Sequence, residues 1–299
     1  MTAWNLIRFA CGAAIAAMLL ATGAEAAHGS SADCENPAQL RFSIIPMDDT
    51  QKQLTAYRPL FERLETVLGK HVVAIAPSSY GAVVEGLLAG SIDLAVLGPA
   101  SYVSAKRSDP DITVFATYAK KAGAFREEGA FYRSMLIVKK GARLQTVESL
   151  RGATLAFVDP VSTSGTVLPL HVFPKVIGMP VNKYFGRITY AGDHPKAALA
   201  VLNGQVDAAF VSGTYLTELV LGGRAKPEDI LVLWRSEPIP MDPIVYRGHL
   251  CEALKDKIRK VFLEAGGEKD KVLLDNLRAT RFVPMNDADY RIIWELPGR

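Results

Sequence analysis

Two stretches of this chain share one helix–turn–strand pattern, and this repeat constrains the fold more than any other feature. The first is Tyr80 to Tyr102, YGAVVEGLLAGSIDLAVLGPASY, and the second is His194 to Leu216, HPKAALAVLNGQVDAAFVSGTYL. At a constant offset the aligned pairs are Leu88 with Leu202, Gly90 with Gly204, Ile92 with Val206, Asp93 with Asp207 and Ala95 with Ala209. Each helix opens on a polar ring, Tyr80 or His194. We interpret the repeat as two similar α/β lobes that present these openings to one ligand, although any helix followed by a buried strand produces part of the pattern.

Strands and helices alternate along the rest of the chain. This alternation favours mainly parallel sheets covered by helices on both faces. We predict strands at 40–46, 72–76, 92–97, 113–118, 132–138, 153–158, 187–190 and 230–234, and helices at 50–68, 80–88, 250–264, 269–279 and 287–296. A proline-rich segment at 238–243 indicates an extended return linker. The chain thus passes from lobe one into lobe two and back again. We predict that lobe one contains 38–138 plus 240–299 and that lobe two contains 139–239.

The N-terminus has the pattern of an export signal. Arg8 supplies a positive charge, Phe9 to Leu20 is apolar, and Ala24-Glu25-Ala26 fits the small-residue cleavage pattern. The apolar run is too short for a membrane span. We therefore predict a signal peptide over 1–26, cleaved before Ala27, a flexible leader over 27–37 and a periplasmic mature protein.

Charge and composition exclude several classes of protein. The net charge of +3 is too small to favour nucleic acid as a partner. The five histidines are scattered without the spacing of metal ligands, so we predict neither a metal site nor a cofactor. Cys34 and Cys251 remain after signal removal. An exported protein allows them to pair, but the sequence leaves both the disulfide and the free thiols open.

Three polar loops follow predicted strands, where open parallel sheets bind their ligands. They are Gly98 to Tyr102, Ser162 to Gly165, and Gly192 to His194. Hydroxyls and backbone N–H groups at a helix start form a donor set suited to a tetrahedral oxyanion. The candidate ligand-binding residues are Tyr80, Ser101, Tyr102, Ser162, Thr163, Ser164 and His194.

Each of these residues also has a purely structural interpretation. Ser and Thr at helix starts are commonly caps, the tyrosines can be packing rings, and His194 can be a cap. Asp93 and Asp207 fit hydrogen-bond acceptors at turns better than ligand groups. We predict no catalytic residues, because the sequence has no G-x-S-x-G, GxxxxGK[ST] or H-E-x-x-H motif. An exported hydrolase that uses Ser164 and His194 is the enzymatic alternative.

The segments AVVEGLLAGSIDLAVLGPASYV, AFVDPVSTSG, GDHPKAALAVLNGQVDAAFV and VLWRSEPIPMDPIV occur in this order along the chain. Through them the region from Arg41 to about Arg259 resembles the phosphate/phosphite/phosphonate-binding proteins of ABC importers. The resemblance implies a two-lobed periplasmic binding protein of type II, with two crossover segments and a central ligand cleft. It also implies that the S-T-S loop, Tyr102, Tyr80 and His194 hold the oxyanion.

The resemblance further implies a ligand and a partner. Relatives that take an aminoalkyl ligand add acidic residues for the ammonium, whereas Val211-Ser212-Gly213 here has no carboxylate and Asp242 falls in the linker. The prediction is therefore a small oxyanion, such as phosphite, methylphosphonate or phosphate, delivered to a membrane permease. The alternative is an oxyanion-sensing partner of a membrane histidine kinase.

Overall fold

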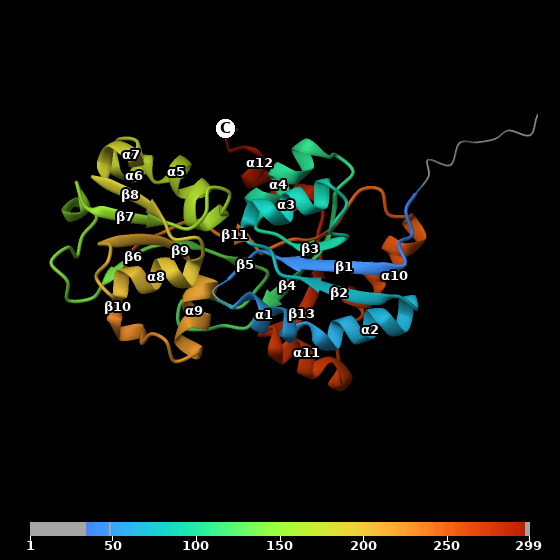
Figure 1. Cartoon of the computed structure of the whole chain (residues 1–299). Coiled ribbons are helices and arrows are strands. Elements are labelled where there is room, and N and C mark those ends of the chain that lie inside the picture. Colours follow the sequence, from blue (N-terminus) through green and yellow to red (C-terminus); the bar gives the residue numbers. More distant parts are fainter. Residues whose placement is uncertain (1–33, 48, 297–299) are drawn as a thin grey trace, which may run out of the picture. The chain divides into compact units, whose positions relative to one another are not determined.

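The computed structural model describes residues 34–47 and 49–296, whose strands form two large mixed sheets and one small antiparallel sheet (Figure 1). The predicted signal peptide lies outside the described residues. The first sheet contains β1 (Gln39–Ile44), β2 (His71–Ile75), β3 (Leu94–Val96), β4 (Thr113–Lys120), β12 (Ile244–Tyr246) and β13 (Ala279–Pro284). The second contains β6 (Ser134–Lys139), β7 (Thr154–Phe157), β8 (Arg187–Tyr190), β9 (Ala208–Ser212) and β10 (Ile230–Arg235). We call the parts of the chain built on these sheets lobe one and lobe two.

The two sheets have the same strand order once the edge strand β13 is set aside. The orders are β2-β1-β3-β12-β4 in lobe one and β8-β7-β9-β6-β10 in lobe two. In each lobe the first three strands pair in parallel, and the next strand, β12 or β6, is antiparallel to its neighbours. This matching topology confirms the predicted two-lobed α/β architecture.

Helices cover both sheets. In lobe one they are α1 (Thr50–Ala56), α2 (Arg58–Leu68), α3 (Tyr80–Leu88), α4 (Pro99–Ser108), α10 (Glu252–Leu263), α11 (Lys271–Asn276) and α12 (Arg291–Trp294). In lobe two they are α5 (Leu168–Val172), α6 (Pro174–Ile177), α7 (Val181–Tyr184), α8 (His194–Leu202) and α9 (Gly213–Leu221). The helix α2 packs on α10 and α11, while α3 packs on α4, which contacts α12. None of the described helices is long and apolar enough to cross a membrane.

Local chemistry explains where two of the predicted helices differ from the observed ones. The predicted helix 50–68 divides at Tyr57, because Pro59 in the first turn of α2 has no N–H to continue the α1 hydrogen-bond ladder. The predicted helix 269–279 ends at Asn276, because Arg278 takes a positive φ of 48° and turns the chain into β13.

The chain crosses between the lobes twice, and the two crossing segments pair with each other. They are β5 (Phe131–Tyr132) and β11 (Ile239–Pro240), which form a small antiparallel sheet. Because β6 belongs to the second sheet, we propose that the first crossing precedes Ser134, whereas the sequence analysis placed the boundary at 138. We propose lobe boundaries at these two segments. The predicted return linker at 238–243 is followed directly by β12, which the sequence analysis did not predict because so short a strand shows no periodicity.

The beginning of the described chain is attached to lobe one. A disulfide joins Cys34 to Cys251, the choice that the sequence left open. Glu35 forms a bridge with Leu250 and accepts two hydrogen bonds from the Arg247 guanidinium, at 2.8 and 2.6 Å. The end of the predicted flexible leader is therefore fixed to the fold.

Each lobe has its own aromatic packing. In lobe one the ring of Phe42 lies 5.1 Å from Tyr57 and 5.0 Å from Phe61. In lobe two the Phe173 ring lies 5.1 Å from Phe210 and 5.4 Å from Trp234. Burial of each such side chain stabilises the fold by roughly 1.5–3 kcal/mol. This packing fixes the strand ends from which the polar loops emerge.

Candidate functional site

The Ser-Thr-Ser segment lies at the carboxyl end of β7 and opens the helical turn Thr163–Val167. The Ser162 hydroxyl accepts a hydrogen bond from the Gly165 N–H at 3.2 Å and so caps this turn. Thr163 faces lobe one, because its hydroxyl accepts a hydrogen bond of 2.8 Å from the Ala100 N–H at the start of α4. All three hydroxyl residues of the segment are at most 2 % exposed. The loop is therefore a buried contact between the lobes.

His194 opens α8 and reaches the same loop. Its Nδ1 accepts a hydrogen bond from the Ser212 N–H at 3.1 Å, so the ring proton must be on Nε2. Nε2 lies 3.5 Å from the Ser162 hydroxyl. Burial lowers the pKa of His194 to about 3. In this arrangement the ring is therefore a neutral N–H donor through Nε2.

Tyr80 opens α3 from lobe one and is 1 % exposed. Burial raises its pKa, the charges of Asp242, Asp159 and Asp193 add to the shift, and the nearby Ser162 hydroxyl acts against it. By strict geometry its hydroxyl has no hydrogen-bond partner among the described residues. A buried hydroxyl without a partner costs about 1–3 kcal/mol. Tyr80 therefore has an unused donor beside the loop of lobe two.

Tyr132, on the crossing strand β5, belongs to this cluster, but sequence reasoning missed it. Its side chain is buried, which raises its pKa; the charge of Asp242 adds to the shift, while hydrogen bonds with Thr163 and Ser164 lower it. The sequence shows it inside an apolar strand, YRSMLIV, where an aromatic ring is expected to pack. The one sequence feature that could have identified Tyr132 was its position on the segment that passes between the lobes.

Ser101 and Tyr102, the two predicted ligand-binding residues on α4, both form hydrogen bonds within the protein. The Tyr102 hydroxyl donates to the Asp287 carboxylate, and its ring packs edge-on against Tyr290 at 5.4 Å. One residue advances a helix by about 100°, so Tyr102 points away from the face on which Ala100 meets Thr163. In this arrangement its hydroxyl is already paired, and its contact with the oxyanion stays a prediction. The hydroxyl of Ser101 donates to the Val161 carbonyl at 3.2 Å and so connects the lobes.

Asp242 is a buried carboxyl of this site, although the sequence placed it in the linker. It follows β11, is 3 % exposed, and accepts a hydrogen bond of 3.4 Å from the Tyr215 hydroxyl. Burial raises its pKa to about 7, although Lys120 and Tyr215 act against the shift. The Tyr215 ring also stacks on His194 at 4.9 Å. The sequence argument against an aminoalkyl ligand, which rested on a missing carboxylate, therefore fails.

These contacts form one connected set of groups drawn from both lobes and from both crossing segments. Tyr80, Tyr132, the Ser-Thr-Ser loop and His194 are neutral hydrogen-bond donors, and Asp242 lies on the other side of Tyr215. Within the described part of the chain, no group of three or more His, Cys, Asp or Glu side chains is arranged to hold a metal ion. The arrangement suits a small anion enclosed between the lobes.

The sequence matches a known protein family over most of its length. Residues 42–290 match the family described as the phosphonate-type periplasmic substrate-binding proteins of ABC transporters. The chain belongs to this family. It is thus a solute-binding component of a transport system, which confirms the resemblance seen in the sequence and the predicted class of function.

Two characterised relatives of this substrate-binding protein cover similar parts of it. The phosphonates-binding periplasmic protein of Escherichia coli is 31% identical over 260 residues, which cover 85% of this chain and 74% of the relative. The phosphate-import protein PhnD of Mycolicibacterium smegmatis is 28% identical over 272 residues, covering 85% and 83%. The names of these relatives include both phosphonate and phosphate.

Solved structures of similar proteins have the same fold. A binding protein component of a phosphonate ABC transporter from Pseudomonas aeruginosa superposes with a TM-score of 0.78 at 26% identity, over 87% of this chain and 86% of that one. The PhnD1 protein of Prochlorococcus marinus, solved with methylphosphonate, gives 0.76 at 21% identity, over 87% and 97%. The fold of this substrate-binding protein is thus that of phosphonate-binding proteins.

Proposed function

We propose that this protein captures a small tetrahedral oxyanion of the phosphonate, phosphite or phosphate type and delivers it to the permease of an ABC importer. The observation that carries the proposal is the buried set of neutral donors contributed by Tyr80, Tyr132, Ser164 and His194. Such donors bind an anion through short charge-assisted hydrogen bonds. The names of the two characterised relatives support the same ligand class.

The two lobes supply different parts of the proposed site. Lobe two supplies the Ser-Thr-Ser loop and His194, while lobe one supplies Tyr80. A ligand that bonds to both sides stabilises the closed arrangement of the lobes, because the donors then have partners. Closure is the signal that a permease can recognise. The family description names a transporter component, which favours delivery to a permease over the sensor-kinase alternative.

Calorimetric titration of the mature protein tests the proposal. The panel is phosphite, phosphate, methylphosphonate and aminoethylphosphonate, with sulfate as a tetrahedral control of different charge and protonation. We expect saturable binding of at least one phosphorus oxyanion and weaker binding of sulfate. Absence of saturable binding across the phosphorus panel would refute the proposal.

A pair of tyrosine variants locates the site. Tyr132→Phe removes a donor beside Thr163 and Ser164 and should weaken binding by about 1.5–3 kcal/mol, the contribution of a hydrogen bond to a charged group. Tyr102→Phe is the comparison variant, because its hydroxyl already bonds to Asp287 and should therefore contribute less to binding. Equal losses of affinity in the two variants would show that the ligand lies elsewhere.

The last part of the proposal concerns how the protein reaches the periplasm. We propose that residues 1–26 are removed on export, so that the periplasmic protein begins at Ala27 and retains Cys34 for its disulfide. The intact mass of the protein released from the periplasm measures this directly. A mass that still includes residues 1–26 would contradict it.

A further inference from the structure

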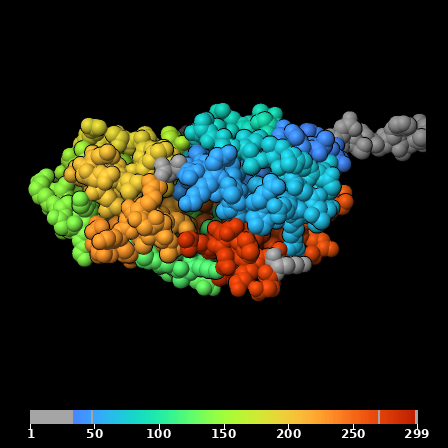
Figure 2. Space-filling view, turned by 60° about the horizontal axis from the view of Figure 1, so that its bottom comes forward, coloured from blue at the N-terminus to red at the C-terminus, as the bar shows by residue number. Residues whose placement is uncertain are grey.

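A large cavity adjoins the proposed oxyanion site. It has a volume of about 550 Å³, and its wall includes Pro195, Thr214, Tyr215 and Met241. Pro195 directly follows His194, Met241 directly precedes Asp242, and Tyr215 stacks on His194. The cavity therefore begins where the proposed anion site ends. Figure 2 shows the surface hollowed where α1 (blue), the α9 region (orange) and the residues near 276–278 (red) meet.

The cavity is larger than a small oxyanion requires. Sites for drug-sized ligands have volumes of about 300–1,000 Å³, whereas one water takes up about 30 Å³ in the liquid. A phosphonate group bound by Tyr80, the Ser-Thr-Ser loop and His194 leaves this space beside it. A ligand that fills the cavity has a substituent on the phosphorus that is longer than a methyl group.

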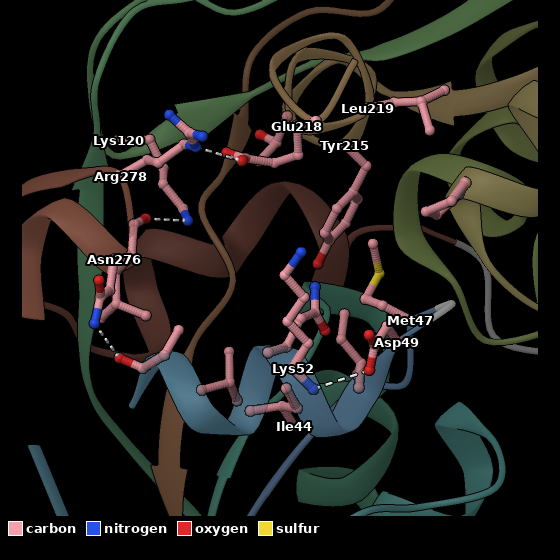
Figure 3. Close-up of a pocket in the computed structure, with 18 of the residues that line it drawn as sticks. Ile44, Met47, Asp49, Lys52, Lys120, Tyr215, Glu218, Leu219, Asn276 and Arg278 are labelled. Atoms are coloured by element: carbon pink, nitrogen blue, oxygen red, sulfur yellow. Dashed lines mark hydrogen bonds and ion pairs between the residues drawn. The ribbon is translucent and has the colours of Figure 1, made fainter. Parts of the chain in front are cut away.

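The charges that line the cavity indicate what such a substituent carries. Four basic side chains and two acidic ones are present, and both acidic groups already have partners. Glu218 accepts from Arg278 at 2.8 Å and from Arg126 at 3.4 Å, and Asp49 accepts from the Lys52 N–H at 2.9 Å. Figure 3 shows Lys120, Arg278 and Glu218 along one side and Lys52 with Asp49 on the other, with Tyr215 between them.

Lys120 is the cation best placed to receive an anionic group. Its Nζ donates to the Leu277 carbonyl at 2.7 Å and lies over the Tyr118 ring at 4.5 Å. An ammonium has three donors, so further acceptors can bind to it. Burial lowers the pKa of Lys120 to about 8, with Arg126 and Arg278 adding to the shift and Glu218 and Asp242 acting against it. An arriving anion would supply a further countercharge. Asp242 acts on Lys120 from nearby but is not among the described residues that line the cavity.

We propose that this cavity binds the far end of a phosphonate whose substituent ends in an anionic group, such as a carboxylate, with Lys120 and Lys52 as the receiving cations. The inference rests on the proposed function, because the phosphonate group itself occupies the site of Tyr80, Ser164 and His194. It extends that function by naming the class of substituent. The competing class is a cationic tail directed at Asp242.

Calorimetry with three phosphonates of matched length tests the inference on the full mature chain. Phosphonopropionate has a carboxylate end, propylphosphonate a neutral end and aminoethylphosphonate an ammonium end. We expect phosphonopropionate to bind about tenfold more tightly than propylphosphonate, the gain that one charge-assisted hydrogen bond provides. Equal affinities, or tightest binding of aminoethylphosphonate, would overturn the inference while leaving the proposed function intact. Absence of binding by every phosphonate and by phosphite would overturn both.

Three lysine variants identify the receiving group. Lys120→Met should abolish the preference for phosphonopropionate over propylphosphonate, and Lys52→Gln should reduce it severalfold. The matched control is Lys121→Met, one position along the chain, because Lys121 pairs with Asp275 on the surface. Lys52 is exposed, so its variant decides the question even if Lys120→Met fails to fold. A preference unchanged in both cavity variants would remove these lysines from the site.

Discussion

The two helix–turn–strand units have the same backbone but different surroundings. Both helices end in a left-handed glycine, Gly90 with φ 68° and Gly204 with φ 71°, and both have a side-chain cap at the start. Asp93 and Asp207 stand at equivalent places, where each accepts a hydrogen bond from a backbone N–H of the neighbouring strand, at 2.8 and 2.7 Å. Both aspartates are thus structural acceptors, as the sequence suggested.

The surroundings of the two aspartates differ greatly. Asp93 is fully buried and receives the guanidinium groups of Arg41 and Arg247, each at 2.8 Å. Burial opposes its ionisation, but the hydrogen bonds from these arginines outweigh the effect and lower its pKa. Asp207 is exposed and bonds only within the strand start at Thr154, among the contacts of the described residues. A repeated pattern therefore specifies the turn without specifying how much stability it contributes.

The loops after the topologically equivalent strands β1 and β7 also differ, and this difference bears on the proposed anion site. In lobe one the helix after β1 is capped by Asp49, a carboxylate that accepts a hydrogen bond from the Lys52 N–H. In lobe two the turn after β7 is capped by the neutral Ser162. A helix start attracts anions, so the neutral cap after β7 favours a charged ligand more than the acidic cap after β1 does.

The largest expected effect is a difference in the free energy of unfolding between variants of Asp93 and Asp207. Asp93→Ala leaves two arginines without their buried partner and should lower the free energy of unfolding by about 3–5 kcal/mol. Asp207→Ala removes one exposed set of hydrogen bonds and should cost about 1 kcal/mol. Urea unfolding at neutral pH with the disulfide intact measures both. Equal costs would mean that the burial of Asp93 has no energetic consequence.

The second crossing segment is followed by Asp242, a carboxyl with no equivalent in either helix–turn–strand unit. Its titration should make the free energy of unfolding depend on pH. The pKa of Asp242 is raised to about 7, so between about pH 4 and pH 7 the unfolded chain ionises at this position while the folded protein does not. The folded state therefore loses stability as pH rises through this range, by up to about 4 kcal/mol. Asp242→Asn should remove this loss. A wild type and variant with parallel stability profiles from pH 4 to 7 would contradict the raised pKa.

The next effect compares the two helix openings. Tyr80→Phe should weaken oxyanion binding by about 2 kcal/mol, because its unpaired hydroxyl is proposed to bond to the ligand. The same variant should leave the unfolding free energy unchanged or slightly higher, since a buried unpaired hydroxyl is lost. Titration and urea unfolding of one preparation give both numbers. A loss of stability with unchanged affinity would show that the hydroxyl is structural.

A smaller and equal effect is expected at the two glycines. Gly90→Ala and Gly204→Ala place a Cβ on a left-handed residue, which costs about 1 kcal/mol each. Neither position is crowded, since the nearest atom to an added Cβ is Arg247 Nη1 at 3.9 Å for Gly90, and none lies within 4 Å for Gly204. Thermal unfolding compares the two variants. Clearly unequal shifts would show that the two turns are not equivalent.

The smallest expected effect is a flat pH response at His194. Its pKa of about 3 keeps the ring neutral, so its contribution to binding should not change between about pH 5 and pH 8. The measured quantity is the ratio of wild-type to His194→Gln affinity, which cancels the titration of the ligand itself. A ratio that falls as pH rises past about 6.5 would restore the imidazolium as the binding form.

Much of this protein was decided by the sequence. The repeat, the strand pattern and the quoted motifs predicted two α/β lobes, and the boundaries of α3 and β8 agree with the structure residue for residue. Glycine at a left-handed turn and Ser or Asp at a helix start act through local backbone chemistry, so a single sequence reveals them. The same local logic identified the Ser-Thr-Ser loop and His194, whose side chains are in contact.

Tertiary structure alone decided which side chains share the site. Tyr102 and Tyr132 are both tyrosines in apolar stretches, yet one bonds to Asp287 and the other lies beside Thr163 and Ser164. Asp242 joins the candidate site because β12 returns to the first sheet and places the preceding segment between the lobes. The direction of a side chain across a helix or a crossing segment depends on packing with residues far away in the sequence, and no local pattern records that packing.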